Sequence, residues 1–258
     1  MSGKAALIGA TGFVGSYLRS TGGYTHFYNS TNIADIRNEH FDVVVCAGTS
    51  AVKWRANAEP EQDRAGVEKL RAALEQTRAD QFFLISTVDV FLNPQKVDET
   101  TPVTLEGLHP YGRHRYELEN FVREKFSRAS VLRLPTIYGS GLKKNPLYDL
   151  LHRHRTDQIP RDAAFQWYHL HRLPQDLHRA VEIPLLHLAT EPIPMHTILT
   201  RLFPDQPEAG KSGPAASYDM RTIHAQKFGG TGHYIADAET VLSELAAFVK
   251  DSRAALAS

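Results

Sequence analysis

Residues 6–15 read Ala-Leu-Ile-Gly9-Ala-Thr-Gly12-Phe-Val-Gly15, an apolar run that leads directly into a Gly-x-x-Gly-x-x-Gly turn. Glycine allows a positive φ and a close approach of the backbone to a phosphate, and the amides that open the next helix, expected at about 14–20, would face its negative charge. A glycine-rich turn can also end an ordinary strand, but a second apolar strand, expected at about 24–28, completes a βαβ unit. The segment therefore predicts a dinucleotide cradle formed by Gly9, Thr11, Gly12, Phe13, Val14 and Gly15.

The composition is that of a globular protein. The chain has 258 residues, 42% hydrophobic and 22% charged, enough for one large domain or a domain with a smaller partner. Its 29 basic and 29 acidic residues give zero formal net charge, which argues against nucleic acid or a membrane as a partner. The single cysteine, Cys46, excludes an intrachain disulfide and is expected to be a buried thiol. No membrane-spanning or signal-peptide pattern is present, so we expect a soluble, cytoplasmic protein.

Apolar strands alternate with helical stretches in the first half of the chain. Strands are expected at 42–48, 81–87 and 130–134, and helices at 60–78 and 110–127. This alternation predicts an α/β fold of the Rossmann type, a doubly wound parallel sheet that binds ligands at the carboxyl ends of its strands.

The amino-acid composition changes after Gly139, where prolines, histidines and arginines become frequent. We expect a dinucleotide-binding domain over 1–139 with parts of the later chain, and a smaller C-terminal substrate lobe over most of 140–237. An amphipathic helix is expected within 238–258.

Two segments carry candidate chemistry, the strand end at Thr87 and the helix start at His109–Arg115. Tyr111 would lie one helical turn from Arg115, on the same helix face. A permanent cation at that distance favours the phenolate, so we expect a lowered pKa for Tyr111. A core tyrosine beside a solvated arginine is the alternative for an isolated pair, but the dinucleotide cradle favours a functional role.

These motifs, together with Leu132-Arg-Leu-Pro-Thr-Ile-Tyr-Gly139, resemble the extended short-chain dehydrogenase/reductase family of nucleotide-sugar epimerases, dehydratases and reductases. The resemblance covers most of the chain. It implies that Thr87 hydrogen-bonds the substrate oxygen and that Tyr111 is the general acid/base. It also implies that Arg115 replaces the usual lysine, which holds the nicotinamide ribose and polarises the tyrosine, and that Pro135 and Ile137 line the nicotinamide pocket. The replacement bears on both ribose geometry and the proton relay, because a planar guanidinium differs from a compact ammonium.

The strand end Ser86-Thr87-Val88-Asp89 is most similar to that of the 4-keto-deoxysugar reductases, which have an acid where this chain has Val88. The dehydratases carry two acids there, and Asp89 corresponds to the second. Asp89 would either share a strand face with Thr87 and assist the site, or be a turn residue.

The cofactor implied by the resemblance is NADP or NAD. NAD-selective members end the second strand with an acid, whereas this chain has Asn29-Ser30-Thr31-Asn32, with no lysine or arginine for a 2′-phosphate either. The missing acid favours NADP. Asp35 and Ile36 resemble the pair that contacts adenine, although Asp35 could simply cap a helix. Ala47, Gly48 and Thr49 would lie beside the adenosine and the phosphates.

The substrate lobe has a local surplus of cations between residues 143 and 172, including Lys143 and Lys144. Such a surplus suits a diphosphate, although a solvated basic face is the alternative. Trp167 and His169 resemble the segment that lines the sugar-nucleotide site. No metal site is expected at His152-x-His154 or His169-x-His171, because no nearby acid or cysteine completes a ligand set.

The leading hypothesis is an NAD(P)-dependent oxidoreductase that reduces a keto group of a nucleotide-activated sugar, with Tyr111 as proton donor. The alternatives are an epimerase or dehydratase with tightly bound NAD, and a catalytically impaired NAD(P)-binding sensor or structural protein. The segment 218–234 resembles the endings of epimerase-like proteins of sugar-biosynthesis loci, an association with polysaccharide biosynthesis that assigns the segment no role. Packing of this segment against the cofactor lobe is the alternative. The resemblance also implies a homodimer, formed through the helices after Pro60 and Pro110.

Overall fold

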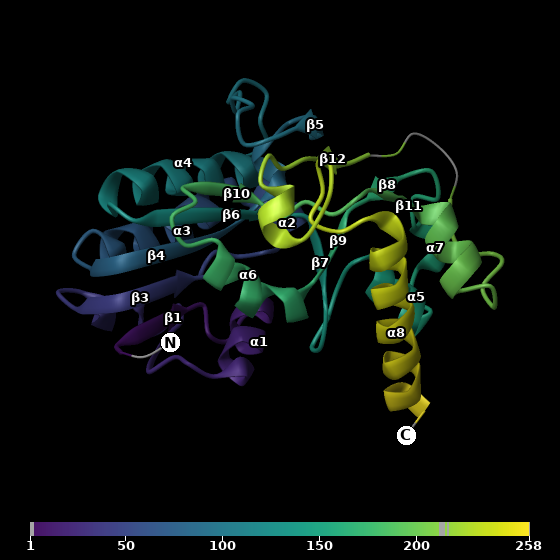
Figure 1. Cartoon of the computed structure of the whole chain (residues 1–258), viewed down its shortest axis with the longest axis horizontal. Coiled ribbons are helices and arrows are strands. Elements are labelled where there is room, and N and C mark those ends of the chain that lie inside the picture. Colours follow the sequence, from purple (N-terminus) through teal and green to yellow (C-terminus); the bar gives the residue numbers. More distant parts are fainter. Residues whose placement is uncertain (1–2, 212–214, 216, 258) are drawn as a thin grey trace. The chain divides into compact units, whose positions relative to one another are not determined.

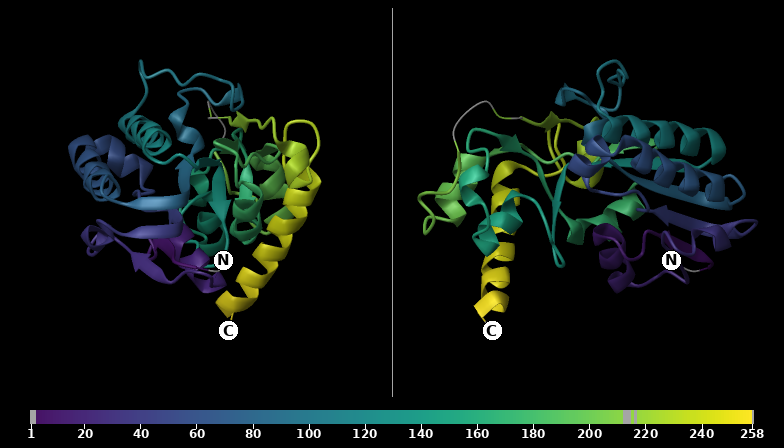
Figure 2. Two further views of the ribbon diagram at one scale, coloured as in Figure 1. Left: turned by 60° about the vertical axis from the view of Figure 1, so that its left-hand side comes forward. Right: turned by 180° about the vertical axis from the view of Figure 1, so that it is seen from behind.

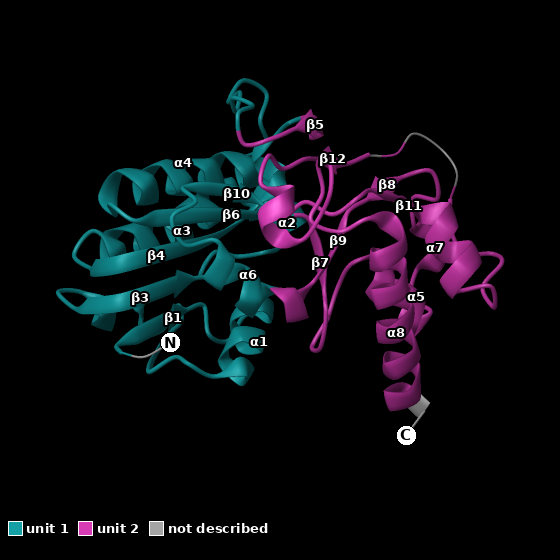
Figure 3. Ribbon diagram, viewed as in Figure 1, with its two compact units in different colours: residues 1–92, 100–134, 173–187 teal, residues 93–99, 135–172, 188–258 magenta. Residues whose placement is uncertain are grey.

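The computed structural model describes residues 3–211, 215 and 217–257. The chain divides into two compact units (Figure 3). Unit 1 comprises residues 1–92, 100–134 and 173–187, and unit 2 comprises residues 93–99, 135–172 and 188–258. A late segment, 173–187, thus belongs to the same unit as the N-terminal chain.

Unit 1 is built on a six-stranded sheet in the order β10-β6-β4-β3-β1-β2, in which every pair is parallel (Figure 1). The expected parallel Rossmann-type sheet is therefore confirmed. Strand order reverses at β1, which pairs with β2 on one side and β3 on the other, and such a switch point is where open α/β sheets bind ligands. The strands are β1 (Ala5–Ile8), β2 (His26–Tyr28), β3 (His40–Cys46), β4 (Arg78–Thr87), β6 (Ala129–Leu134) and β10 (Leu185–His187).

Helices cover both faces of this sheet. They are α1 (Phe13–Thr21), α2 (Lys53–Ala58), α3 (Pro60–Leu74), α4 (Pro110–Lys125) and α6 (Leu173–Arg179). Figure 2 shows α3 and α4 side by side, and their apolar residues, such as Leu70 and Val122, join one core cluster with strand residues. Because the order of the strands reverses after β2, right-handed crossovers place α1 on the face opposite to α3 and α4. Helix α6 packs against α1.

A thiol and an ion pair are buried in unit 1. Cys46 is buried and reduced, as expected, and burial raises the pKa of its thiol to about 12. A fully buried ion pair, Arg133 to Glu119 at 2.6 Å, ties β6 to α4. No described helix combines the length and apolar character needed to cross a membrane.

The described residues of unit 2 form short paired strands, three α-helices and short 3-10 helices around a second core cluster. The strand pairs are β5 (Gln95–Val97) with β12 (Asp219–Met220), β7 (Thr136–Tyr138) with β9 (Trp167–His169), and β8 (Ala164–Phe165) with β11 (Ile193–Pro194). The helices are α5 (Pro146–His152), α7 (Met195–Leu202) and α8 (Ala238–Ala257).

Candidate active site

Two positions of the glycine turn after β1, Gly9 and Gly15, have no room for a side chain. Gly9 has φ +82°, and a Cβ there would lie 2.2 Å from the carbonyl oxygen of Ala47. A Cβ on Gly15 would lie 2.0 Å from the carbonyl oxygen of Gly9. Helix α1 opens at Gly12 with no side-chain cap and no acid in its first turn, which suits an anion at this helix end.

A cavity of about 370 Å³ lies beside this turn, at the carboxyl ends of β1, β2 and β3. Eight of the predicted cofactor residues line it: Gly9, Thr11, Gly12, Asn29, Ser30, Ala47, Gly48 and Thr49. Its position at the switch point and its amide-rich floor fit the adenosine and pyrophosphate of a dinucleotide. The sequence analysis did not predict that helix α3 forms one wall of the cavity, through Gln62, Asp63, Gly66, Val67, Lys69 and Leu70. The remaining lining residues are Ile8, Ile33 and Ser50.

Other predicted cofactor residues do not line this cavity. Phe13, Val14 and Gly15 form the first turn of α1 behind it. Ile36, in the 3-10 helix η1 (Ile33–Ile36), is fully buried in the core, and Asp35 is exposed, so the side chain that η1 presents to the cavity is Ile33. Pro135 and Ile137 belong to unit 2.

Thr87 and Tyr111 are brought together as predicted from their motifs. Thr87 ends β4, Tyr111 opens α4, and their side chains are hydrogen-bonded. The amide of Tyr111 donates to Asn57 Oδ1 at 3.0 Å, which fixes the start of α4 to α2. A Cβ on Gly112 would lie 2.1 Å from the carbonyl oxygen of Asp89, so glycine is what allows α4 to approach the turn after β4.

The expected lowering of the Tyr111 pKa is wrong in sign. Burial raises the pKa of Tyr111 and outweighs the opposing effect of Arg115, while Asp89 adds to the increase. The hydrogen bond from Thr87 and the charge of Lys53 lower it by less. The phenol is therefore protonated at neutral pH and is poised to donate a proton.

Arg115 is buried, and most of its donors are already engaged. Nη1 and Nη2 clamp both carboxylate oxygens of Asp63, Nη2 also donates to the Ser50 carbonyl at 2.6 Å, and Nη1 to the Tyr111 carbonyl at 3.2 Å. Of the five guanidinium N–H groups, that of Nε alone has no partner among the described residues. The guanidinium carbon lies 3.9 Å from the centre of the Tyr111 ring, so Arg115 stacks on the phenol and pairs with an acid at the same time.

Asp63 is the counter-ion that the sequence prediction missed. It extends from α3, lines the cavity, and also hydrogen-bonds His114 Nδ1 at 2.7 Å. Burial alone would raise the pKa of Asp63, but the hydrogen bonds from Arg115 and His114 hold it below its usual value. The charge beside Tyr111 is thus largely neutralised by a neighbour on another helix.

Asp89 proves to be a turn residue, in the 3-10 helix η2 (Val88–Val90). Its amide donates to Thr87 Oγ1 at 3.1 Å, and its carboxylate pairs with Lys53 Nζ at 2.7 Å. Lys53 opens α2, a helix that the sequence analysis did not predict. A second acid and a second cation therefore lie near the Thr87–Tyr111 pair.

The predicted substrate residues lie in unit 2. Lys143 and Lys144 are exposed, and His169 is half-buried at the end of β9. Trp167 is fully buried in the core cluster of unit 2, so its role in this structure is packing.

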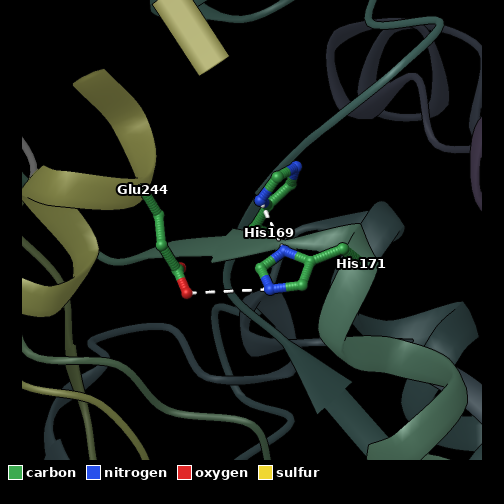
Figure 4. A group of neighbouring side chains, drawn as sticks. All are labelled: His169, His171 and Glu244. Carbon is green, nitrogen blue, oxygen red and sulfur yellow. Dashed lines mark hydrogen bonds and ion pairs between the residues drawn. The ribbon is translucent and has the colours of Figure 1, made fainter. Parts of the chain in front are cut away.

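Figure 4 shows His169 and His171 beside Glu244, an acid that α8 brings from far along the sequence. His171 Nδ1 faces His169 Nδ1 at 2.5 Å, and its Nε2 faces Glu244 Oε1 at 3.7 Å. The two nitrogens of His171 thus point to different neighbours, and both Glu244 oxygens already pair with Arg172. One ligand atom of each side chain lies within 4.8 Å of the others, so the expectation that no acid completes a ligand set here is wrong, because the fold brings Glu244 to the two histidines. Burial, His171 and Arg172 lower the pKa of His169 to about 4, which keeps that ring neutral.

Part of the chain matches a known protein family. The model of the NAD dependent epimerase/dehydratase family matches residues 24–157, just over half of the chain, including Thr87, Tyr111 and Arg115. A curated relative, N-acetyl-alpha-D-glucosaminyl-diphospho-ditrans,octacis-undecaprenol 4-epimerase of Escherichia coli O157:H7, is 27% identical over an alignment of 183 positions, gaps included; the alignment covers 58% of this chain and only 54% of that protein.

Solved structures share the fold along nearly the whole chain. MoeE5 in complex with UDP-glucose and NAD gives a TM-score of 0.76 at 17% identity, covering 98% of this chain and 100% of that one. A dTDP-4-dehydrorhamnose reductase from Bacillus anthracis str. Ames in complex with NADP gives a TM-score of 0.71 at 15% identity, and the match covers 97% of this chain and 99% of that one. The family match and the fold confirm the resemblance seen in the motifs and the nicotinamide cofactor that it implies. The chain belongs to the NAD dependent epimerase/dehydratase family.

Proposed function

We propose that this chain is an NAD(P)-dependent oxidoreductase that reduces a keto group of a nucleotide-activated sugar. The observation that carries the proposal is Tyr111, a buried phenol that is hydrogen-bonded to Thr87 and whose pKa is raised. A tyrosine held protonated is suited to donate a proton to a carbonyl oxygen, which is the requirement of the reductive direction.

Each nearby residue has a distinct task in this proposal. A bound reduced nicotinamide supplies a hydride to the carbonyl carbon. Tyr111 gives its proton to the carbonyl oxygen, so that the ketone becomes an alcohol and the tyrosine a phenolate. Thr87 hydrogen-bonds the substrate oxygen and then the phenolate. Arg115, stacked on the ring and fixed by Asp63, positions Tyr111 and favours the phenolate that forms.

The substrate class rests on the relatives. Their names concern sugars attached to a diphosphate or a nucleotide. We assign Lys143 and Lys144 to the diphosphate, because both are exposed cations, and His169 to the sugar. A homodimer remains a prediction, which sedimentation velocity would test.

An epimerase is the second candidate, because the curated relative is a 4-epimerase. It would use the same Tyr111 and Thr87, but would keep its cofactor between turnovers. Denaturing the purified protein and identifying the released nucleotide by mass spectrometry separates the two: near-stoichiometric NAD supports the epimerase, and an exchangeable site supports the reductase.

The direct test is an assay with UDP- and dTDP-4-keto-6-deoxysugars, in which the loss of reduced-nicotinamide absorbance is followed. We expect turnover by the wild type, loss of it in Tyr111→Phe, and retention in the matched control Tyr116→Phe, which alters a tyrosine on the same helix. An active Tyr111→Phe variant would refute the assigned role. A wild type that binds NADPH but turns over no keto-sugar would instead support the impaired cofactor-binding protein.

A further inference from the structure

The end of β2 carries a cluster of hydrogen-bond donors whose chemistry decides which nicotinamide cofactor the chain takes. In Rossmann-type folds, the adenosine ribose lies at this strand end, where an acid accepts from the 2′-hydroxyl of NAD and a cation accommodates the 2′-phosphate of NADP. The side chains at the end of β2 therefore indicate whether the site suits NAD or NADP.

Asn29, at the position of the usual acid, cannot serve as an acceptor. Its Oδ1 already accepts from the amide of Thr31 at 2.8 Å and from the Thr31 hydroxyl at 2.6 Å. A backbone amide can only donate, so this bond fixes the orientation of the Asn29 carboxamide. The side-chain group that Asn29 has left for a ligand in the cavity is its NH₂, a donor.

Lys69 supplies the cation that the sequence of this loop lacks. It extends from the exposed side of α3, and its Nζ donates to the Ser30 carbonyl at 2.7 Å. Lys69, Ser30 and Asn29 line the same cavity as the glycine turn. An ammonium has three N–H donors, so two remain for an anion after the bond to Ser30.

The charges around the cavity support the same reading. Among the described lining residues, Asp63 is the one carboxylate, and Arg115 and His114 already occupy it. None of the carboxylates that the structure describes pairs with Lys69. The cavity end at β2 thus offers donors and a positive charge, which suit a phosphate and not a bare diol.

We propose that Lys69, with Asn29 and Ser30, forms a subsite for a 2′-phosphate monoester, and that the chain therefore selects NADP(H) over NAD(H). This inference rests on the cofactor half of the proposed function and is independent of the sugar and of the reaction at Tyr111.

The test is equilibrium binding by isothermal titration calorimetry, with NADPH and NADH as ligands and with 2′,5′-ADP and 5′-AMP as minimal probes. We expect the wild type to bind each 2′-phosphorylated ligand about 10- to 100-fold more tightly than its counterpart. Lys69→Met should remove most of this ratio by weakening only the phosphorylated ligands, and Lys69→Arg should keep it. The ratio should also shrink as salt is raised, because the site is exposed.

Lys125→Met is the matched control. Lys125 is another exposed lysine, on α4, and it also donates to a backbone carbonyl, that of Glu75 at 2.6 Å. This variant should bind all four ligands as the wild type does. Equal binding of NADPH and NADH by the wild type, or an unchanged ratio in Lys69→Met, would overturn the proposal while leaving the proposed function intact. Failure to bind any dinucleotide would refute both.

Discussion

Replacing Arg115 by methionine should destabilise the protein by about 3–5 kcal/mol, because it leaves the buried carboxylate of Asp63 without its main partner. The two side chains are only 3% and 5% exposed, so water does little to screen the lost interaction. The carbonyl oxygens of Ser50 and Tyr111 lose donors as well, which favours the upper part of that range.

A double-mutant cycle isolates the pair. Asp63→Asn should lower the free energy of unfolding by a similar amount, because it leaves an uncompensated guanidinium in the interior. The double variant removes both charges, so its loss of stability should be about 2–3 kcal/mol smaller than the sum of the two single losses. Arg64→Met is the matched control: Arg64 pairs with Glu117 across the same two helices, but both side chains are about two-fifths exposed. This exposed pair should contribute less than about 1 kcal/mol.

Equilibrium urea unfolding at neutral pH measures these costs through the transition midpoint and slope. The pKa of Asp63 lies below its usual value in the folded protein, so its contribution to stability is present above the usual carboxyl pKa and is lost as the pH falls through the folded one. The Arg115→Met penalty should therefore shrink in acid, where Asp63 becomes protonated. A penalty no larger than that of Arg64→Met, or an additive double variant, would refute the buried pair as the anchor of Arg115.

Three further predictions concern the phenol. Tyr111→Phe should lower the reductase kcat by about 10²–10⁴-fold with a small effect on the cofactor Kd, measured by steady-state kinetics and calorimetry. Because burial raises the Tyr111 pKa, kcat should stay level from about pH 7 to about pH 9 and fall only as the pH rises through the raised value; a basic limb near neutrality would contradict this. Lys53→Met should shift the fall in kcat to a higher pH, since the Lys53 charge lowers the Tyr111 pKa. A shift of this fall to a lower pH would contradict that role of Lys53, which pairs with Asp89.

Most of the sheet could be predicted from local patterns. The strands around Val45, Phe83 and Leu132 are apolar runs of ordinary length between turn or helix signals, and Pro60 and Pro110 mark the first turns of α3 and α4. Strand β10 was not predicted, because its three residues are too few to show a period and it pairs with β6 only after the chain has passed through unit 2.

The site was predictable in its motifs but not in its electrostatics. The spacing of Tyr111 and Arg115 shows that a cation lies one turn away, but it does not show that Asp63, on another helix, neutralises that cation. The sign of the Tyr111 pKa shift depends on this packing and on burial. For the same reason no local pattern could place Lys69 next to Ser30 or Glu244 next to His171, because each contact joins elements far apart in the sequence.

The glycine turn has a consequence for redesign of the cofactor site. Side chains added at Gly9 and Gly15 would collide with backbone, so these two positions of the glycine turn tolerate no substitution. The wall that α3 supplies is different, because Gln62 and Lys69 are exposed on a regular helix. We therefore expect cofactor preference to be adjustable on the helical wall, where a new side chain would leave unchanged the backbone that we assign to the pyrophosphate.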